Sequence, residues 1–118
     1  MTNKQYALCV SEASEYADRD VYISDLALST IWDDDPESEI PVERMAQLSS
    51  IYDAVHRSVP EIAAAAGISN RKLADRFCIP YRTVENWCGG QRNCPDYIRL
   101  MMQECLGLLK GGIANESL

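Results

Sequence analysis

The sequence predicts an all-α fold, a compact helical bundle preceded by a helical N-terminal extension. Apolar residues recur at steps of three and four along much of the chain, which is the spacing of a buried helix face. Serine, proline and glycine residues stand at positions where helices begin and end. Strand signals are weak by comparison, and the best of them, at residues 21–23, is short.

Two helices are expected near the N-terminus. The first covers about 3–17, where apolar side chains recur at helical spacing. The charged residues 18–20 are interpreted as the break that follows it. Ser24 is interpreted as the N-cap of a second, shorter helix over 25–32, because a serine hydroxyl accepts a hydrogen bond from the first turn.

The clearest amphipathic helix begins at Pro41, since proline favours the first turn of a helix. Asp53 and Arg57 are four positions apart, so we expect them to pair on its surface. His56 lies beside the apolar stripe and is interpreted as a packed or surface residue. The stripe itself consists of Val42, Met45, Leu48, Tyr52, Val55 and Val59.

Shorter helices are expected in the second half of the chain. One covers 60–66 and ends at Gly67, because glycine enters the left-handed backbone region at little cost. Ser69 is expected to cap the next helix, and Pro95 to begin a closing helix. Apolar residues in excess at 106–109 suggest a dimer contact at the end of that closing helix.

The most informative stretch is 69–92, which fits two short helices that cross at a tight turn. Such a crossing needs a small residue where the second helix packs on the first, and Ala74 provides it. Pro80 is placed to start the second helix and the pair Gly89-Gly90 to end it. The other positions expected to be buried are Leu73, Phe77, Ile79, Val84 and Trp87.

This stretch resembles the Cro/C1-type (XRE-like) helix-turn-helix family of prokaryotic and phage regulators. The resemblance covers roughly residues 60–109 and does not extend to residues 1–40. Cys78 departs from the family pattern, because members usually carry glycine in the turn, and a cysteine there is strained if its φ angle is positive. The matching residues are Arg71-Lys72-Leu73-Ala74, Ile79 to Trp87, Gly90-Gln91-Arg92 and Pro95.

The resemblance implies that the helix Tyr81–Cys88 enters the major groove of double-stranded DNA and that the protein is a homodimer. No catalytic, cofactor-binding or metal-binding residue is implied. The residues expected to contact base edges are Tyr81, Arg82, Thr83, Glu85 and Asn86. The residues expected to contact phosphates are Asn70, Arg71, Lys72, Gln91 and Arg92.

A second alignment of the same pattern also exists. Ile62-Ala63, Gly67-Ile68 and Leu73 satisfy it as well, and they make 70–77 the second helix. The later alignment is preferred, because it alone includes the pair Val84 and Trp87 and the loop of Gln91 and Arg92 after the glycines.

Charge is distributed unevenly along the chain, whose net charge is -7. Residues 1–60 have four basic and twelve acidic side chains, whereas residues 61–118 have seven basic and six acidic ones. The acidic half, with its run at 33–39, favours an alternative function, in which the protein is an adaptor or an inhibitor that binds a basic protein partner. The run at 33–39 is otherwise expected to be a solvated linker.

The predicted organisation is a helical N-terminal extension with an acidic linker at 1–40, a helix-turn-helix domain at 41–110 and a flexible tail at 111–118. No apolar run is long enough to cross a membrane and no signal peptide is recognised, so a cytoplasmic location is expected. The five cysteines lack the spacing of a zinc site, and no catalytic motif is present, so an enzyme is not expected.

Overall fold

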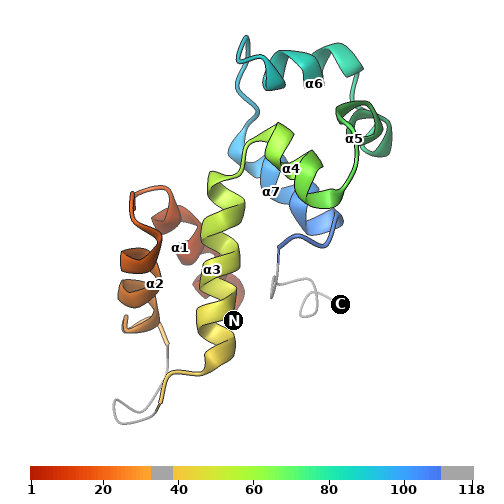
Figure 1. Ribbon diagram of the computed structural model, residues 1–118. Helices are drawn as coiled ribbons and strands as arrows, with labels where there is room; N and C mark the ends of the chain where they lie inside the picture. The colour runs from red at the N-terminus through yellow and green to blue at the C-terminus, as the bar shows by residue number, and fades with distance from the viewer. Residues whose placement is uncertain (33–38, 110–118) are drawn as a thin grey trace. The chain divides into compact units, whose positions relative to one another are not determined.

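The computed structural model describes residues 1–32 and 39–109, and its regular secondary structure in these ranges is entirely α-helical (Figure 1). This result confirms the predicted fold class. The chain divides into two compact units, which are described separately. Of the described residues, the N-terminal unit comprises 1–32, 39–55 and Leu109, and the C-terminal unit comprises His56–Leu108. No helix in the described ranges has the length and apolar character needed to span a membrane.

Three helices form the described part of the N-terminal unit: α1 (Asn3–Ala13), α2 (Arg19–Ala27) and α3 (Val42–His56). All three contribute to one core, in which Cys9, Tyr22, Leu48 and Ile51 are fully buried. The hydroxyl of Tyr22 donates to the carbonyl oxygen of Cys9 at 2.8 Å, so the buried phenol has its hydrogen-bond partner. Burial raises the pKa of the Cys9 thiol to about 11.

The first two helices differ from the prediction. The first helix ends at Ala13 instead of residue 17. Ser14 follows it, and the Ser14 hydroxyl donates to the carbonyl oxygen of Ser11. The second begins at Arg19 and ends at Ala27, so the predicted helix over 25–32 with Ser24 as its cap is wrong. Asp18, interpreted as part of a break, is the N-cap, because its carboxylate accepts from two backbone N–H groups of the first turn.

The long helix α3 begins at Val42, one residue after the predicted start at Pro41, and it ends at His56, so that Val59 of the predicted stripe belongs to α4 instead. The rest of the stripe is only partly buried. Val42 is 82 % exposed and Met45 is 45 % exposed, whereas Arg44 is buried in their place. The predicted ion pair between Asp53 and Arg57 is also wrong. Asp53 pairs instead with Arg19 of α2 at 2.9 Å, while Arg57 donates to a glutamine in the C-terminal unit. His56 is exposed.

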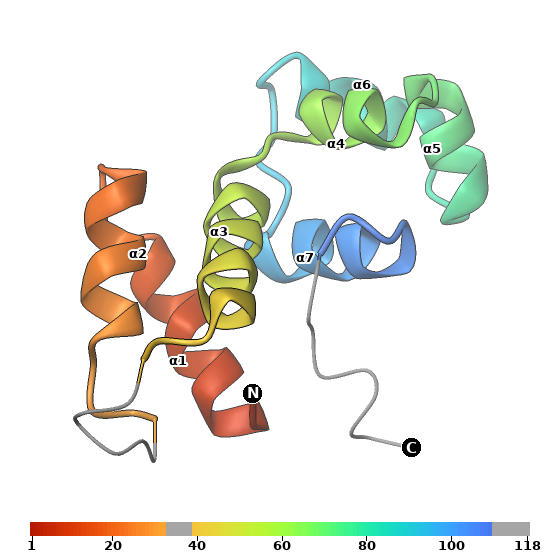
Figure 2. The ribbon, with the colours of Figure 1, turned by 60° about the horizontal axis from the view of Figure 1, so that its bottom comes forward.

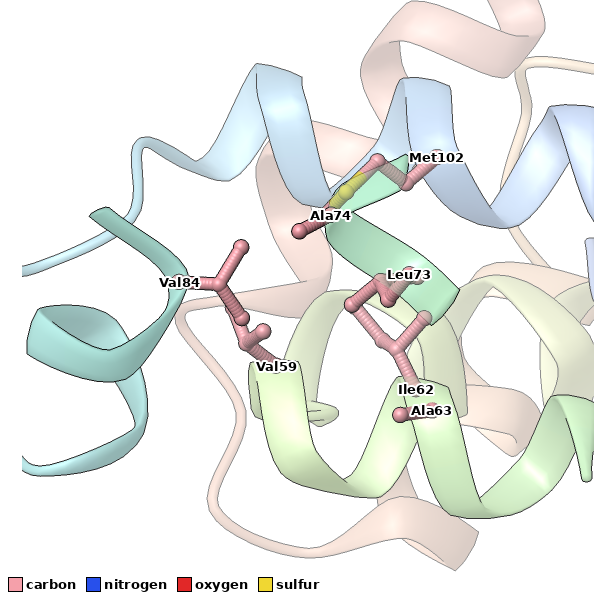
Figure 3. Packing of buried hydrophobic residues seen from close by; sticks show 7 residues of the cluster. All are labelled: Val59, Ile62, Ala63, Leu73, Ala74, Val84 and Met102. Atoms are coloured by element: carbon pink, nitrogen blue, oxygen red, sulfur yellow. The ribbon is translucent and has the colours of Figure 1, made fainter. Parts of the chain in front are cut away.

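Four helices form the C-terminal unit: α4 (Val59–Ala66), α5 (Asn70–Arg76), α6 (Tyr81–Cys88) and α7 (Asp96–Cys105). Their bounds follow the prediction closely, with Ser58, Ser69 and Pro95 immediately before α4, α5 and α7. Figure 3 shows side chains from all four helices meeting in one core. The buried residues of this core are Val59, Ile62, Ala63, Leu73, Ala74, Val84 and Met102.

The same hydrogen-bonded turn ends three helices of this unit. In each, the residue four positions after a helical carbonyl has a positive φ angle, and the N–H one position later donates back to that carbonyl. The donor residues are apolar: Ile68 donates to Ala63 at 3.0 Å, Ile79 to Ala74 at 2.9 Å and Leu108 to Gln103 at 2.8 Å. The positive-φ residues are Gly67, Cys78 and Gly107. Two of the three are glycines, so Cys78 occupies a position that favours glycine.

Gln103 is a fully buried polar residue on α7. Its Oε1 accepts from the guanidinium of Arg57 at 2.9 Å, and its Nε2 donates to the carbonyl oxygen of Arg99 at 3.2 Å. The guanidinium of Arg99 in turn donates to the carbonyl oxygen of Arg57 at 2.7 Å. These bonds hold α7 against the segment that precedes α4, and they satisfy the buried amide.

The predicted boundary between extension and domain lies at residue 40. The chain divides into its two units between residues 55 and 56, so nearly all of α3 belongs to the N-terminal unit. The helices α1, α2 and α3 are seen from a second direction in Figure 2. Most of the predicted acidic linker, residues 33–38, and the predicted tail at 111–118 lie outside the described residues.

Candidate nucleic-acid interface

The helices α5 and α6 are joined by a short turn and packed together through buried side chains. Leu73 and Ala74 of α5 and Val84 of α6 are all inaccessible to solvent. In Figure 3, Val84 points toward Val59 of α4, and Leu73 lies against Ile62 of the same helix. Because one side of α6 is held in this core, its opposite side is presented to solvent along the whole short helix.

The five residues expected to contact base edges all lie on α6, but their exposure differs. Arg82 and Glu85 are exposed, whereas Tyr81, Thr83 and Asn86 are partly buried. Helix α6 enters the buried core through Val84, and Tyr81, Trp87 and Cys88 pack against that core. Tyr81 is therefore the one residue of the five that lies on the core side of α6. The helix therefore presents a mixed polar surface with one guanidinium and one carboxylate at its centre.

A stacked pair connects the starts of α5 and α6. The guanidinium carbon of Arg71 lies 4.0 Å from the ring centroid of Tyr81, which is the geometry of a cation–π contact. Arg71 was expected to contact a phosphate and Tyr81 a base edge. The structure brings them into contact, and no spacing rule within one helix predicts this, because the two residues belong to different helices.

The N-terminus of α6 has no side-chain cap. Pro80 stands at the cap position with φ of -54° and makes no side-chain hydrogen bond. At the start of α5, by contrast, the hydroxyl of Ser69 accepts from the N–H of Lys72 at 3.1 Å. The first turn of α6 therefore keeps a partial positive charge that no side-chain oxygen of the cap residue offsets.

The loop after α6 carries the two remaining residues expected to contact phosphates. Arg92 and Gln91 are both exposed. The N–H of Arg92 donates to the carbonyl oxygen of Asn86 at 3.3 Å, which holds the loop against the end of α6. The side chain of Gln91 lies so close to Gly89 that a β-carbon at position 89 would overlap its amide. Glycine at position 89 therefore leaves room for the Gln91 side chain at the end of α6.

The exposed basic side chains of this region are not paired with acids. Among residues 1–32 and 39–109, no ion pair involves Arg71, Lys72 or Arg82, nor Arg76 or Arg92. Asn70, also expected to contact a phosphate, is the first residue of α5 and is partly buried. Arg76 was not assigned a role from the sequence, although its exposed position on α5 was recognisable from the helical spacing.

The alternative alignment of the motif also has a structural counterpart. The helices α4 and α5 are joined through Gly67 by the same hydrogen-bonded turn that joins α5 and α6 through Cys78. Geometry of the turn alone therefore does not distinguish the two alignments. The later alignment is preferred on the sequence alone, because only it includes the pair Val84 and Trp87 and the loop of Gln91 and Arg92.

Comparisons with protein-family models, curated proteins and solved structures found no match to this chain. Within residues 1–32 and 39–109, no group of three or more histidine, cysteine or carboxylate side chains is arranged to hold a metal ion.

Proposed function

We propose that the protein is a DNA-binding transcriptional regulator of the Cro/C1 type, in which α5 and α6 form a helix-turn-helix and α6 reads the major groove. The observation that carries this proposal is the polar surface of α6, opposite its buried Val84 and beside exposed, unpaired basic side chains.

In this proposal the residues of α6 that read the bases are Tyr81, Arg82, Thr83, Glu85 and Asn86. Arg82 is fully available to grip a guanine through two hydrogen bonds, and Asn86 is placed one helical turn later to pair with an adenine. Arg71 is stacked on Tyr81, so its guanidinium group is held beside the first residue of α6. Lys72 of α5 and Arg92 of the loop after α6 are both exposed and suit phosphates.

The proposal also includes a homodimer in the cytoplasm of a prokaryotic or phage-infected cell. A regulator with one reading helix per chain doubles its contact with DNA when two copies bind adjacent half-sites. The free energies of the two half-sites then combine, and a palindromic operator follows from the two-fold symmetry.

The test is fluorescence anisotropy of the full chain with a random pool of duplex DNA, at about 50 and 200 mM salt. We expect binding that weakens steeply with salt, because phosphate contacts release counterions. After an operator is selected, Arg82→Ala is expected to cost about 1–3 kcal/mol on that site only. Arg92→Ala is expected to weaken binding to all duplexes alike.

The matched control is Lys4→Ala, which also removes one exposed positive charge but lies on α1 of the N-terminal unit. It is expected to leave DNA affinity almost unchanged. If Arg82→Ala and the wild type bind the selected operator equally, α6 is not the reading helix.

A second candidate function is favoured by charge. Residues 1–55 have three basic and twelve acidic side chains, whereas His56–Leu108 has seven basic and five acidic ones. An acidic unit of this kind suits an adaptor or an inhibitor that binds a basic protein surface. Absence of DNA binding even at the lower salt concentration would favour this function over the first.

A further inference from the structure

The ring of Tyr81 links the core of the C-terminal unit to a cation on its surface. Tyr81 is partly buried and packs against the core that Val84 enters. The guanidinium carbon of Arg71 lies over the same ring, 4.0 Å from its centroid. Because the core fixes the ring, the ring in turn fixes the place of the guanidinium beside α6.

Arg71 also has a potential partner within its own helix. Asp75 lies four positions later on α5, a spacing at which an arginine and an aspartate commonly form an ion pair. Both residues are exposed, yet no ion pair joins them within residues 1–32 and 39–109. An exposed ion pair and an exposed cation–π contact have similar strengths, so the two partners compete for one guanidinium. The ring of Tyr81 therefore keeps Arg71 apart from the carboxylate that would neutralise its charge.

A second arginine of α5 provides a comparison. Arg76 also lies over an aromatic ring, that of Phe77, but its guanidinium carbon is 5.4 Å from the ring centroid. Phe77 packs against the same core as Tyr81. Arg76 and Phe77 are neighbours in sequence, whereas Arg71 and Tyr81 belong to different helices. Of these two contacts, only that of Arg71 joins α5 to α6.

The hydrogen-bond donors of the Arg71 guanidinium are accessible to an anion. A guanidinium that is stacked by its face keeps its N–H groups at the edge, and these bind carboxylate or phosphate oxygens in pairs. In the part of the chain that the structure describes, no hydrogen bond or ion pair occupies the Arg71 side chain. An anion that approaches from solvent therefore meets a guanidinium whose position is already set.

We propose that Tyr81 is a positioning residue, whose ring holds Arg71 away from Asp75 and directs its guanidinium to a backbone phosphate of duplex DNA. This role rests on the proposed function, in which α5 and α6 contact DNA, and it is additional to the contact of Tyr81 with a base edge. Because the guanidinium is held before DNA binds, less conformational entropy is lost in the complex. Every duplex has phosphates, so the ring affects the affinity for all sequences.

The experiment measures the affinity of full-chain variants for a random pool of duplex DNA at several salt concentrations. Tyr81→Leu keeps an apolar side chain against the core but removes the ring. We expect it to weaken binding about tenfold and to reduce the slope of log affinity against log salt by about one, because one phosphate contact is lost. Tyr81→Phe keeps the ring, so it is expected to keep the wild-type slope although the hydroxyl is absent.

Two further variants separate positioning from a loss of packing. Phe77→Leu also removes a partly buried ring that packs against the core and lies under an arginine, but no DNA contact is assigned to it. It is expected to leave the salt slope unchanged. Asp75→Ala is expected to raise the affinity more in Tyr81→Leu than in the wild type, because Asp75 competes for Arg71 only when the ring is absent.

Three results would overturn the role of the ring. Tyr81→Leu has the same salt slope as Phe77→Leu, Tyr81→Phe lowers the slope as much as Tyr81→Leu, or Asp75→Ala has equal effects with and without the ring. In each of these cases the wild type still binds DNA, so the proposed function stands. Absence of duplex binding by the wild type would instead overturn the proposed function, and the role of Tyr81 with it.

Discussion

Cys78 has a φ angle of 55°, and among the described residues it is the only one other than glycine with a positive value. A side chain in this region costs roughly 1–2 kcal/mol through the contact of its β-carbon with the carbonyl oxygen. The cysteine is exposed, so little burial of its side chain offsets that cost. The resemblance to the family pattern predicted a strained backbone at Cys78 if its φ angle were positive, and the φ angle is positive.

We expect Cys78→Gly to stabilise the protein by about 0.5–1 kcal/mol, which is the relief of strain less the greater entropy of glycine in the unfolded chain. The measurement is urea unfolding of the full chain. Gly67→Ala, at the equivalent position of the preceding turn, is expected to destabilise it by a similar amount, although a β-carbon there meets no atom within 4 Å.

Cys78→Ala is the matched control, because it removes the thiol and keeps the β-carbon. Stabilisation by Cys78→Ala equal to that of Cys78→Gly would show that the thiol, not the backbone angle, is responsible.

At the scale of elements, α4 begins with reciprocal hydrogen bonds between Ser58 and Glu61. The N–H of Glu61 donates to the Ser58 hydroxyl, and the Glu61 carboxylate accepts from the N–H of Ser58 at 3.1 Å. These bonds lower the pKa of Glu61 below its ordinary value of 4.5. A lowered pKa means that the ionised form stabilises the folded state.

Ser58→Ala is expected to cost about 1 kcal/mol at neutral pH, because a first-turn N–H loses its acceptor. The contribution of Glu61 is present above its ordinary pKa and is lost as the pH falls through its lowered pKa in the folded state. In Glu61→Gln, the free energy of unfolding should therefore depend less on pH in the acidic range than it does in the wild type. Unfolding by urea at several pH values checks both effects, and a Glu61→Gln profile identical to that of the wild type would contradict the second.

The elements of the C-terminal unit were predictable because their signals are local. Ser58, Gly67, Ser69 and Pro95 act within one helical turn of where they stand, so their effect is readable from neighbouring residues. Asp18 was misinterpreted, since a carboxylate between two helical patterns either interrupts a helix or caps one, and only the backbone shows which.

The helix that carries most of the candidate site was predictable from the sequence, but the arrangement of its side chains was not. The bounds of α6 agree with the prediction, because Pro80 precedes its first residue and Gly89 follows its last. The contact between Arg71 and Tyr81 depends on how two separate helices pack. No periodicity within one segment contains that information.

For the whole molecule, the two units differ in how salt should affect them. The N-terminal unit repels itself through its excess of carboxylates, whereas the C-terminal unit is nearly balanced. Each unit contains one tryptophan, Trp32 in the first and Trp87 in the second, so fluorescence can follow them separately.

We expect an increase of salt from about 20 to 200 mM to stabilise the N-terminal unit, because the Debye length falls to roughly 7–8 Å and screens the repulsion. Urea unfolding of Trp87→Phe reports this unit, and Trp32→Phe reports the other, where little change is expected. Equal salt effects on the two transitions would show that the charge difference has no energetic effect.

The buried amide of Gln103 also affects the kinetics of folding. The turns through Gly67 and Cys78 join helices that are adjacent in sequence, and such contacts form quickly because they close short loops. The bond from Arg57 to Gln103 spans 46 residues, so the loop that it closes is much longer. We expect the docking of α7 to follow the assembly of α4, α5 and α6, and Gln103→Ala to speed unfolding while leaving the refolding rate almost unchanged. Stopped-flow fluorescence of Trp87 measures both rates, and slower refolding of this variant would place α7 in the folding nucleus instead.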